Sequence, residues 1–383
     1  MRDENNEILA AAKDRERTIV RTSAIGIGAN VMLAAFKAFV GFVSNSIAVM
    51  LDAVNNLSDA FSSVVTIIGA KLGAKPPDKK HPMGYGRIEY LSSMIVAAIV
   101  LYAGLTSLTE SVKKIIEPET AEYTALSLVI ISVAIVVKIV LGLFVKKQGI
   151  KVNSGALTAS GSDALFDAIL SSSVLVSAVI YLIWGISLEA YVGVIISGFI
   201  IKAGIEMMAD TVNEIIGKRG DSETSRELKR IICAEEDVLG VYDIALFNYG
   251  PDRDYASLHI ELPDTVTVDK VDRITRRIQL DVFRETGIII TGISVYSFNT
   301  TDDEAAIMRE KVREVVLAHE WALQMHGFYA DKESKTIRFD VVISFGTDRK
   351  QSLTKLYEEI TALYPEFDIQ IVPDVDMTDL HDE

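Results

Sequence analysis

The chain divides near residue 216 into two parts with different patterns of hydrophobic and polar residues. In the first part, apolar residues form six long runs, each able to supply the roughly 20 residues with which an α-helix crosses a bilayer core. We therefore predict a bundle of six transmembrane helices. The predicted spans are 23–43, 47–70, 90–111, 124–145, 156–184 and 188–208.

Lysine and arginine gather on one side of these predicted spans. They precede the first span, lie between the second and third and between the fourth and fifth, and follow the sixth, whereas the opposite loops hold few. The positive-inside rule then places both termini in the cytoplasm. The polar residues 1–22 are accordingly expected to be a cytoplasmic leader and not a cleavable signal peptide. We expect a multi-pass protein of a bacterial plasma membrane.

After residue 216, the pattern changes to short alternating runs and amphipathic stretches. The order helix, strand, strand, helix, strand is predicted twice, which is typical of a small ferredoxin-like α+β domain that has been duplicated. Four domains follow from this pattern. They are the leader 1–22, a six-span transport domain 23–216, a cytoplasmic αββαβ domain 217–299, and a second αββαβ-like domain with an acidic tail, 300–383.

Composition and charge narrow the functional classes. The chain is 49% hydrophobic, which is high for a soluble protein. Residues 218–383 contain 20 Lys plus Arg against 34 Asp plus Glu, so this part carries −14 of the net charge of −15. An acidic cytoplasmic part argues against nucleic-acid binding, which depends on basic residues. The single cysteine, Cys233, allows no intrachain disulfide and fits a reducing compartment.

Four polar residues interrupt the second and fifth predicted spans. Asn55 and Asp59 are four residues apart, as are Asp163 and Asp167, so each pair lies on one helix face. A charged side chain at mid-membrane costs about 2.5–3.5 kcal/mol, so these groups are expected to face the bundle interior. Three converging carboxylates need a cation or protons to neutralise them. The pattern therefore predicts a site that exchanges a divalent metal for protons.

Other intramembrane residues and other classes of protein were considered. Asp52 is not in register with Asp59 and is expected to line an entry, cap or pair structurally, and Lys37 and Lys138 are interpreted as counter-charges or snorkelling residues. An intramembrane aspartyl protease, a membrane prenyltransferase and a metal-sensing receptor or scaffold stay as alternatives. The protease and prenyltransferase motifs do not match, and a receptor leaves the inward carboxylates unexplained. The sequence contains no Walker motif, so it gives no indication of ATP-driven transport.

These motifs together resemble the cation diffusion facilitator family of metal exporters, over roughly residues 20–298. The strings that carry the resemblance are SNSIAVMLDAVNNLSD, PDKKHPMGYGRIEYLSS and ALTASGSDALFDAILS, each at the family's position. The resemblance implies a homodimeric transporter, not an enzyme, that exports divalent cations against inward proton flow by alternating access. It also places the transport site on Asn55, Asp59, Asp163 and Asp167.

The chemistry of this quartet favours manganese. Zinc-transporting family members generally have a histidine in it, whereas this chain offers four oxygen donors, which suit Mn²⁺ better than Zn²⁺. The NxxxD and DxxxD pair also resembles the family's manganese-exporting branch. We expect Mn²⁺ as the transported ion and protons as the counter-ion. Zn²⁺, Fe²⁺, Co²⁺ and Cd²⁺ are the alternatives.

Two further sites are implied by the resemblance, and both depart from the family pattern. Asp78 and His81 match a second site in the loop after span two, but Tyr85 replaces a histidine that is common there. His259 matches a metal-binding histidine of the family's cytoplasmic domain, but the His and Asp that complete that site are missing. The second repeat has no counterpart in short family members.

Overall fold

The computed structural model describes residues 2–43, 47–117, 125–184, 188–220, 222–251, 253–300, 303–375 and 377. The chain forms two compact units. One comprises Met1–Lys218 with Tyr249–Arg253, and the other comprises Arg219–Asn248 with Asp254–Glu383. Each unit is described by itself below.

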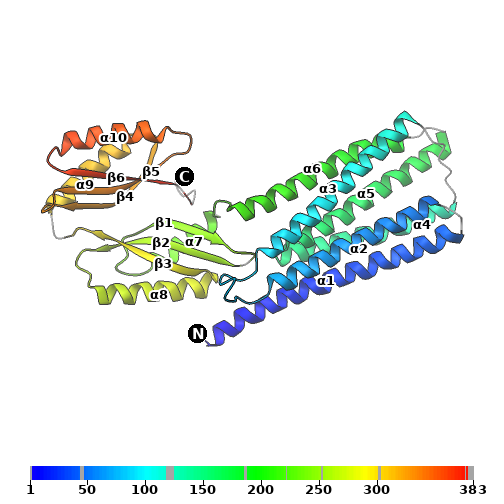
Figure 1. Ribbon diagram of the computed structural model, residues 1–383, viewed down its shortest axis with the longest axis horizontal. Helices are drawn as coiled ribbons and strands as arrows, with labels where there is room; N and C mark the ends of the chain where they lie inside the picture. Colours follow the sequence, from blue (N-terminus) through cyan, green and yellow to red (C-terminus); the bar gives the residue numbers. More distant parts are fainter. Residues whose placement is uncertain are drawn as a thin grey trace. The chain divides into compact units, whose positions relative to one another are not determined.

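The first unit is a bundle of long helices that lie side by side (Figure 1). Its helices are α1 (Arg2–Val43), α2 (Ile47–Gly73), α3 (Ile88–Ile116), α4 (Ala125–Lys151), α5 (Gly155–Trp184) and α6 (Glu189–Ile216). Over the described residues, five of them contain a stretch long and apolar enough to cross a membrane, namely all except α2. Transmembrane helices are thus confirmed, whereas the count of six spans stays a prediction. Residues 2–22, the predicted leader, belong to helix α1.

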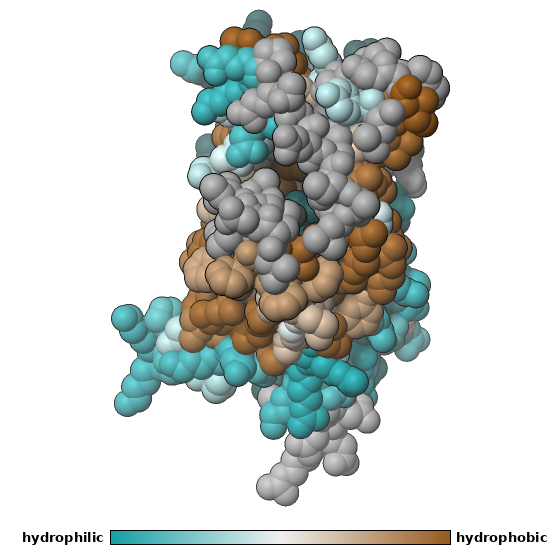
Figure 2. All heavy atoms as spheres, turned by 90° about the vertical axis from the view of Figure 1, so that its right-hand side faces the viewer, coloured by the Kyte–Doolittle hydropathy of each residue, from teal (hydrophilic) through white to brown (hydrophobic). Residues whose placement is uncertain are grey.

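The helices pack mainly in pairs, α4 against α5, α3 against α6 and α1 against α2. Small residues permit the closest approach: a Cβ added at Gly161 on α5 would lie 2.4 Å from the backbone nitrogen of Lys146 on α4. Such small-residue contacts are typical of helices packed in membranes. Large apolar side chains such as Phe39, Phe42 and Phe199 are instead exposed, and Figure 2 shows wide hydrophobic patches of this kind on one face.

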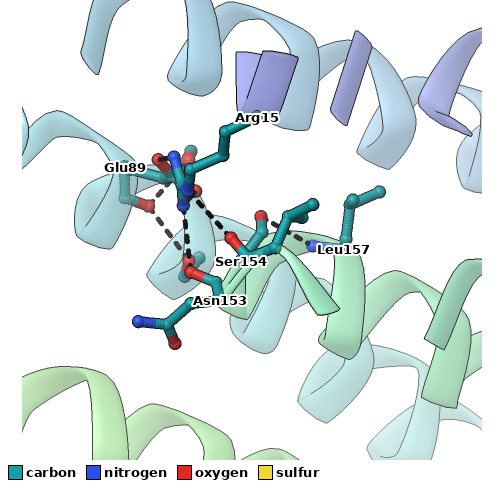
Figure 3. A network of polar contacts seen from close by, with 8 residues as sticks. Arg15, Glu89, Asn153, Ser154 and Leu157 are labelled. Atoms are coloured by element: carbon teal, nitrogen blue, oxygen red, sulfur yellow. Dashed lines mark hydrogen bonds and ion pairs between the residues drawn. The ribbon is translucent and has the colours of Figure 1, made fainter. Parts of the chain in front are cut away.

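A buried ion pair ties three segments together at one end of the bundle (Figure 3). The Arg15 guanidinium on α1 donates to both carboxylate oxygens of Glu89 on α3, each at 2.8 Å. It also donates to the backbone oxygens of Val152 and Asn153 in the turn between α4 and α5. Ser154, in the same turn, accepts from the backbone N–H of Leu157 and caps α5. Bidentate arginine–carboxylate pairs fix geometry strongly, so α1, α3 and the α4–α5 turn are held in one arrangement.

The second unit contains two three-stranded sheets with the same topology. The first αββαβ segment is α7 (Ser222–Ile232), β1 (Gly240–Asn248), β2 (Asp254–Pro263), α8 (Val268–Thr286) and β3 (Ile289–Phe298). The second is α9 (Asp303–Leu317), β4 (Ala322–Asp331), β5 (Thr336–Ile343), α10 (Arg349–Leu363) and β6 (Asp368–Val375). In both, the first two strands pair antiparallel and the last two pair parallel. The predicted α+β fold is confirmed, while its origin by duplication stays a prediction.

Each sheet buries one face under its own helices. Along β2, alternate residues are buried with Leu228 of α7 and Ile278 of α8, and along β5 alternate residues are buried with Leu356 of α10. In Figure 1 the strands of both sheets lie between α8 and α10. The other faces of the two sheets contact each other, since Tyr296 of β3 donates to Asp340 of β5. The second unit is therefore a helix–sheet–sheet–helix arrangement with two separate apolar cores.

Because the cores are separate, a core deletion should act mainly on its own sheet. Phe339 is fully buried in the second core. Phe339→Ala should destabilise β4–β6 by about 3–5 kcal/mol through lost burial and the remaining cavity. Hydrogen exchange followed by mass spectrometry should then show faster exchange in β4–β6 than in β1–β3. Phe345→Ala is the control, since Phe345 is exposed and the Arg219 guanidinium lies over its ring. Equal acceleration in both sheets would contradict separate cores.

Candidate functional site

Three of the predicted carboxylates lie around one buried lysine inside the helix bundle. Lys138 on α4 is 4% exposed. Its ammonium donates to Asp59 Oδ2 on α2 and, at 2.9 Å, to Asp167 Oδ2 on α5. Asp163, one turn before Asp167 on α5, is buried. The structure therefore brings α2, α4 and α5 together through charged groups that the sequence places in three separate apolar runs.

Two cavities meet these residues from opposite sides. Asp59 and Asp163 line a small cavity with Ser23, Asn30 and Ser160. Lys138 and Asp167 line a larger one of about 320 Å³. The larger cavity also contains Lys37 of α1, Glu110 and Lys114 near the end of α3, and Ala190 at the start of α6. It thus reaches toward the end of the bundle that is opposite to the Arg15–Glu89 pair, because Glu89 lies in the first turn of α3.

The ion pairs of Lys138 separate the two cavities. Asp59 lines one cavity and Asp167 the other, and the Lys138 ammonium bonds to both. Burying carboxylates is strongly unfavourable unless they are paired, so this ammonium provides the positive charge that the site requires. A group held only by ion pairs can exchange for another cation that offers the carboxylates equal or better coordination. The carboxylate oxygens are thus chemically suited to a cation, here the Lys138 ammonium.

The structure describes the predicted quartet in part. The side chains of Asn55 and Asp52 lie outside the described residues, while the adjacent Asn56 is buried and lines the larger cavity. Sequence reasoning left Lys138 as either a counter-charge or a snorkelling residue, and the structure shows the counter-charge. The signal was a lone lysine within the apolar run ISVAIVVKIVLGLF.

The loop between α2 and α3 uses Asp78 to organise its own backbone. Asp78 Oδ1 accepts from the backbone N–H groups of Lys80 and His81, and Oδ2 accepts from the Tyr85 hydroxyl at 2.6 Å. The Tyr85 hydrogen bond, with those backbone bonds, lowers the pKa of Asp78. The His81 ring lies 4.4 Å from the Tyr85 ring, and its Nδ1 is 3.8 Å from Asp78 Oδ1. A metal site on Asp78 and His81 stays a prediction, because a metal would have to replace the Tyr85 bond.

His259 lies in the second unit on β2, beside groups that the sequence did not single out. Its ring stacks on Tyr296, and its Nδ1 is 2.9 Å from Asp243 Oδ2. Among the described residues, Asp243, His326 and Asp340 form a group of potential metal ligands. One ligand atom from each of these side chains lies within 4.8 Å of the ligand atoms of the other two. Sequence reasoning missed this group, because its members lie on three different strands.

Comparisons with known proteins identify the family of the helix bundle. The family profile for the cation efflux transmembrane domain matches residues 23–216. An uncharacterized transporter of Methanocaldococcus jannaschii is 27% identical over 258 residues, which cover 67% of this chain and 91% of that protein. The manganese efflux system protein MneP of Bacillus subtilis is 27% identical over 282 residues, 72% of this chain and 94% of that protein. The magnetosome protein MamB of Magnetospira sp. is 26% identical over 281 residues, 71% of this chain and 93% of that protein.

Removing the lysine charge should leave the carboxylates without their partner. Lys138→Met should reduce the free energy of unfolding by about 3–5 kcal/mol, the usual cost of breaking a buried ion pair. Denaturant titration in detergent micelles would measure the loss. The matched control is Lys202→Met, since Lys202 pairs with Glu206 on the exposed surface of α6. An exposed pair is worth about 0.3–0.5 kcal/mol. Equal stability of the two variants would show that Lys138 does not compensate Asp59 and Asp167.

Proposed function

Because this chain belongs to the cation efflux family of membrane metal transporters, it carries divalent metal ions and is not an enzyme, and we propose that it exports Mn²⁺ from the cytoplasm in exchange for protons. The observation that carries the proposal is the placement of Asp59, Asp163 and Asp167 around the exchangeable ammonium of Lys138. Asn55, one helical turn before Asp59, is the proposed fourth ligand.

The choice of Mn²⁺ rests on donor chemistry. Carboxylate and amide oxygens are hard ligands that suit Mn²⁺, whereas Zn²⁺ favours imidazole and thiolate. The proposed quartet holds no histidine or cysteine. Similarity to a manganese efflux protein supports the same choice. Zn²⁺, Fe²⁺, Co²⁺ and Cd²⁺ remain the competing substrates, and a relative affinity measurement separates them.

In the proposed cycle, Lys138 is the counter-ion of the metal-free site. An entering Mn²⁺ brings two positive charges to the carboxylates, and the Lys138 ammonium leaves Asp59 and Asp167 as the metal binds. When the metal departs, the ammonium returns with one positive charge and a proton on a carboxylate supplies the second. Asn55 contributes a neutral carbonyl, which protons do not compete for at physiological pH. Charge balance at the site thus couples metal movement to proton movement.

Alternating access follows from the two cavities. The larger cavity reaches Asp167 and Lys138 from one end of the bundle, while the Arg15–Glu89 pair binds helices together at the other end. With both termini in the cytoplasm and six spans, the Arg15 end is the cytoplasmic one, so this arrangement is proposed as outward-facing. Opening inward would require Arg15 to release Glu89. The remaining proposals are a homodimer, a bacterial plasma membrane, and the domains 1–22, 23–216, 217–299 and 300–383.

Neutralising one carboxylate without changing its shape should abolish transport. Asp163→Asn should reduce Mn²⁺ uptake by proteoliposomes with an imposed proton gradient to the level of empty liposomes, because the site loses a charged ligand. A fluorescent Mn²⁺ indicator inside the vesicles measures uptake. Asp210→Asn is the control, since Asp210 is exposed near the end of α6. Transport of Mn²⁺ by folded Asp163→Asn at the rate of the control would refute this site, and Zn²⁺ transport without Mn²⁺ transport would refute the proposed substrate.

Selectivity should change when a nitrogen donor replaces the amide. Asn55→His should shift preference from Mn²⁺ toward Zn²⁺ by about tenfold or more, because imidazole is a better ligand for Zn²⁺. The ratio of initial uptake rates in the same proteoliposomes is the readout. Asn56→His is the matched control at the next position of α2. An unchanged ratio in Asn55→His would remove Asn55 from the site.

A further inference from the structure

All six strands of the second unit contribute one polar side chain to the contact between the two sheets. These residues, here termed the inter-sheet cluster, are Asp243 on β1, His259 on β2, Tyr296 on β3, His326 on β4, Asp340 on β5 and Asp374 on β6. They are linked across the sheets, since Tyr296 bonds to Asp340 and His326 lies 2.9 Å from Asp243. A polar cluster assembled from every strand is a feature of both repeats together and of neither alone.

The imidazole of His326 is buried, and its two nitrogens lack hydrogen bonds among the described residues. Its side chain has no solvent exposure, and among the described residues neither Nδ1 nor Nε2 makes a hydrogen bond of acceptable geometry. Nε2 nevertheless points into the cluster, at 2.9 Å from Asp243 Oδ1 and 3.8 Å from Asp374 Oδ2. An unsatisfied buried polar group is costly and requires a partner. A cation bound between the imidazole and the carboxylates would be such a partner.

The hydroxyl of Tyr296 has fewer hydrogens than the carboxylates beside it could accept, which also indicates that a positive charge is missing there. Its hydroxyl lies 2.8 Å from Asp243 Oδ2 and 2.7 Å from Asp340 Oδ2, but it has a single hydrogen to donate. Within the described part of the chain, neither carboxylate forms an ion pair with lysine or arginine. Asp340 is buried and Asp243 is partly buried, and carboxylates removed from water in this way need neutralisation by protons or by a metal ion.

The backbone holds these side chains in place. Asp243 has φ of 53° at an irregularity in the β1–β2 pairing, and the β4–β5 pairing is irregular after His326, where Gly327 has φ of 61°. Bulges and left-handed residues redirect side chains and are frequent at functional sites. Ring stacking fixes the imidazoles further, since His326 stacks on Tyr242 and His259 on Tyr296. The backbone and the stacked rings therefore keep these side chains close together on neighbouring strands.

We propose that the inter-sheet cluster binds one divalent transition-metal ion, with Asp243, His326 and Asp340 as its ligands. Their ligand atoms already lie within 4.8 Å of one another, so small side-chain rotations bring them around a common centre. One imidazole and two carboxylates form a mixed nitrogen and oxygen set that accepts Mn²⁺, Fe²⁺, Co²⁺ or Zn²⁺. Tyr296 is the outer hydrogen-bond partner that orients both carboxylates. Since two ligands belong to the second repeat, the ion would tie the two repeats together.

The test counts metal ions in the full-length protein. Purified chain in detergent is stripped with chelator, equilibrated with Co²⁺, desalted and analysed by mass spectrometry for bound metal. His326→Gln and Asp340→Asn should each bind one Co²⁺ per chain fewer than wild type. His319→Gln is the matched control in the same repeat, because His319 pairs with Glu359 outside the cluster. The loss should recur in an Asp163→Asn background, which separates this site from the transmembrane one.

A second readout follows the binding of Co²⁺ to the wild-type chain. Co²⁺ added to stripped wild-type chain should slow hydrogen exchange in peptides of β1, β4 and β5 at least tenfold, and should give a visible absorption spectrum that His326→Gln alters. Equal metal content in wild type and in both folded variants would overturn the proposal. So would unchanged exchange in these three strands when Co²⁺ is added to wild type.

Discussion

The transmembrane unit depends on neutralising carboxylates inside a bundle of apolar helices. Asp59 and Asp167 would be prohibitively costly in a bundle interior without a positive partner, and the Lys138 ammonium supplies one to both. This pairing determines how α2, α4 and α5 are juxtaposed. In the proposed cycle the same pairing has to break, and a lysine on a flexible stem is a partner that can withdraw. A permanently apolar core would be at least as stable but could carry nothing.

Other features of the bundle are consistent with this constraint. The small-residue contact between α4 and α5 at Gly161 keeps Lys138 and Asp167 on closely packed helices. The Arg15–Glu89 pair applies the same rule at one end, since a buried carboxylate there is matched by a bidentate guanidinium. The two ion-pair networks differ in the number of hydrogen bonds that must break before the cationic side chain can leave. Lys138 holds two helices by single bonds, whereas Arg15 forms a four-bond junction that must open as a unit.

Sequence reasoning located the elements well because their signals are periodic and local. The apolar runs, the four-residue spacing of Asp163 and Asp167 and the alternation along β2 and β5 depend only on neighbours in sequence. The missed features are pairings between distant elements. Lys138 is separated from Asp59 by 79 residues, and no periodicity indicates which carboxylate a lone lysine meets.

The inter-sheet cluster illustrates the same limit more strongly. The neighbours of His326 in sequence are ordinary strand residues, and its surroundings arise only when two sheets meet. The charged groups of the cluster can be compared with those of the transmembrane site. Both gather carboxylates from separate elements, but one contains a lysine, whose ammonium bonds to two of its three carboxylates. Among its described residues the other has two imidazoles and one shared phenolic hydrogen for three carboxylates. Among the described residues of each site, the carboxylates outnumber the lysine and arginine side chains bonded to them, and this excess of negative charge is why we propose a cation for both.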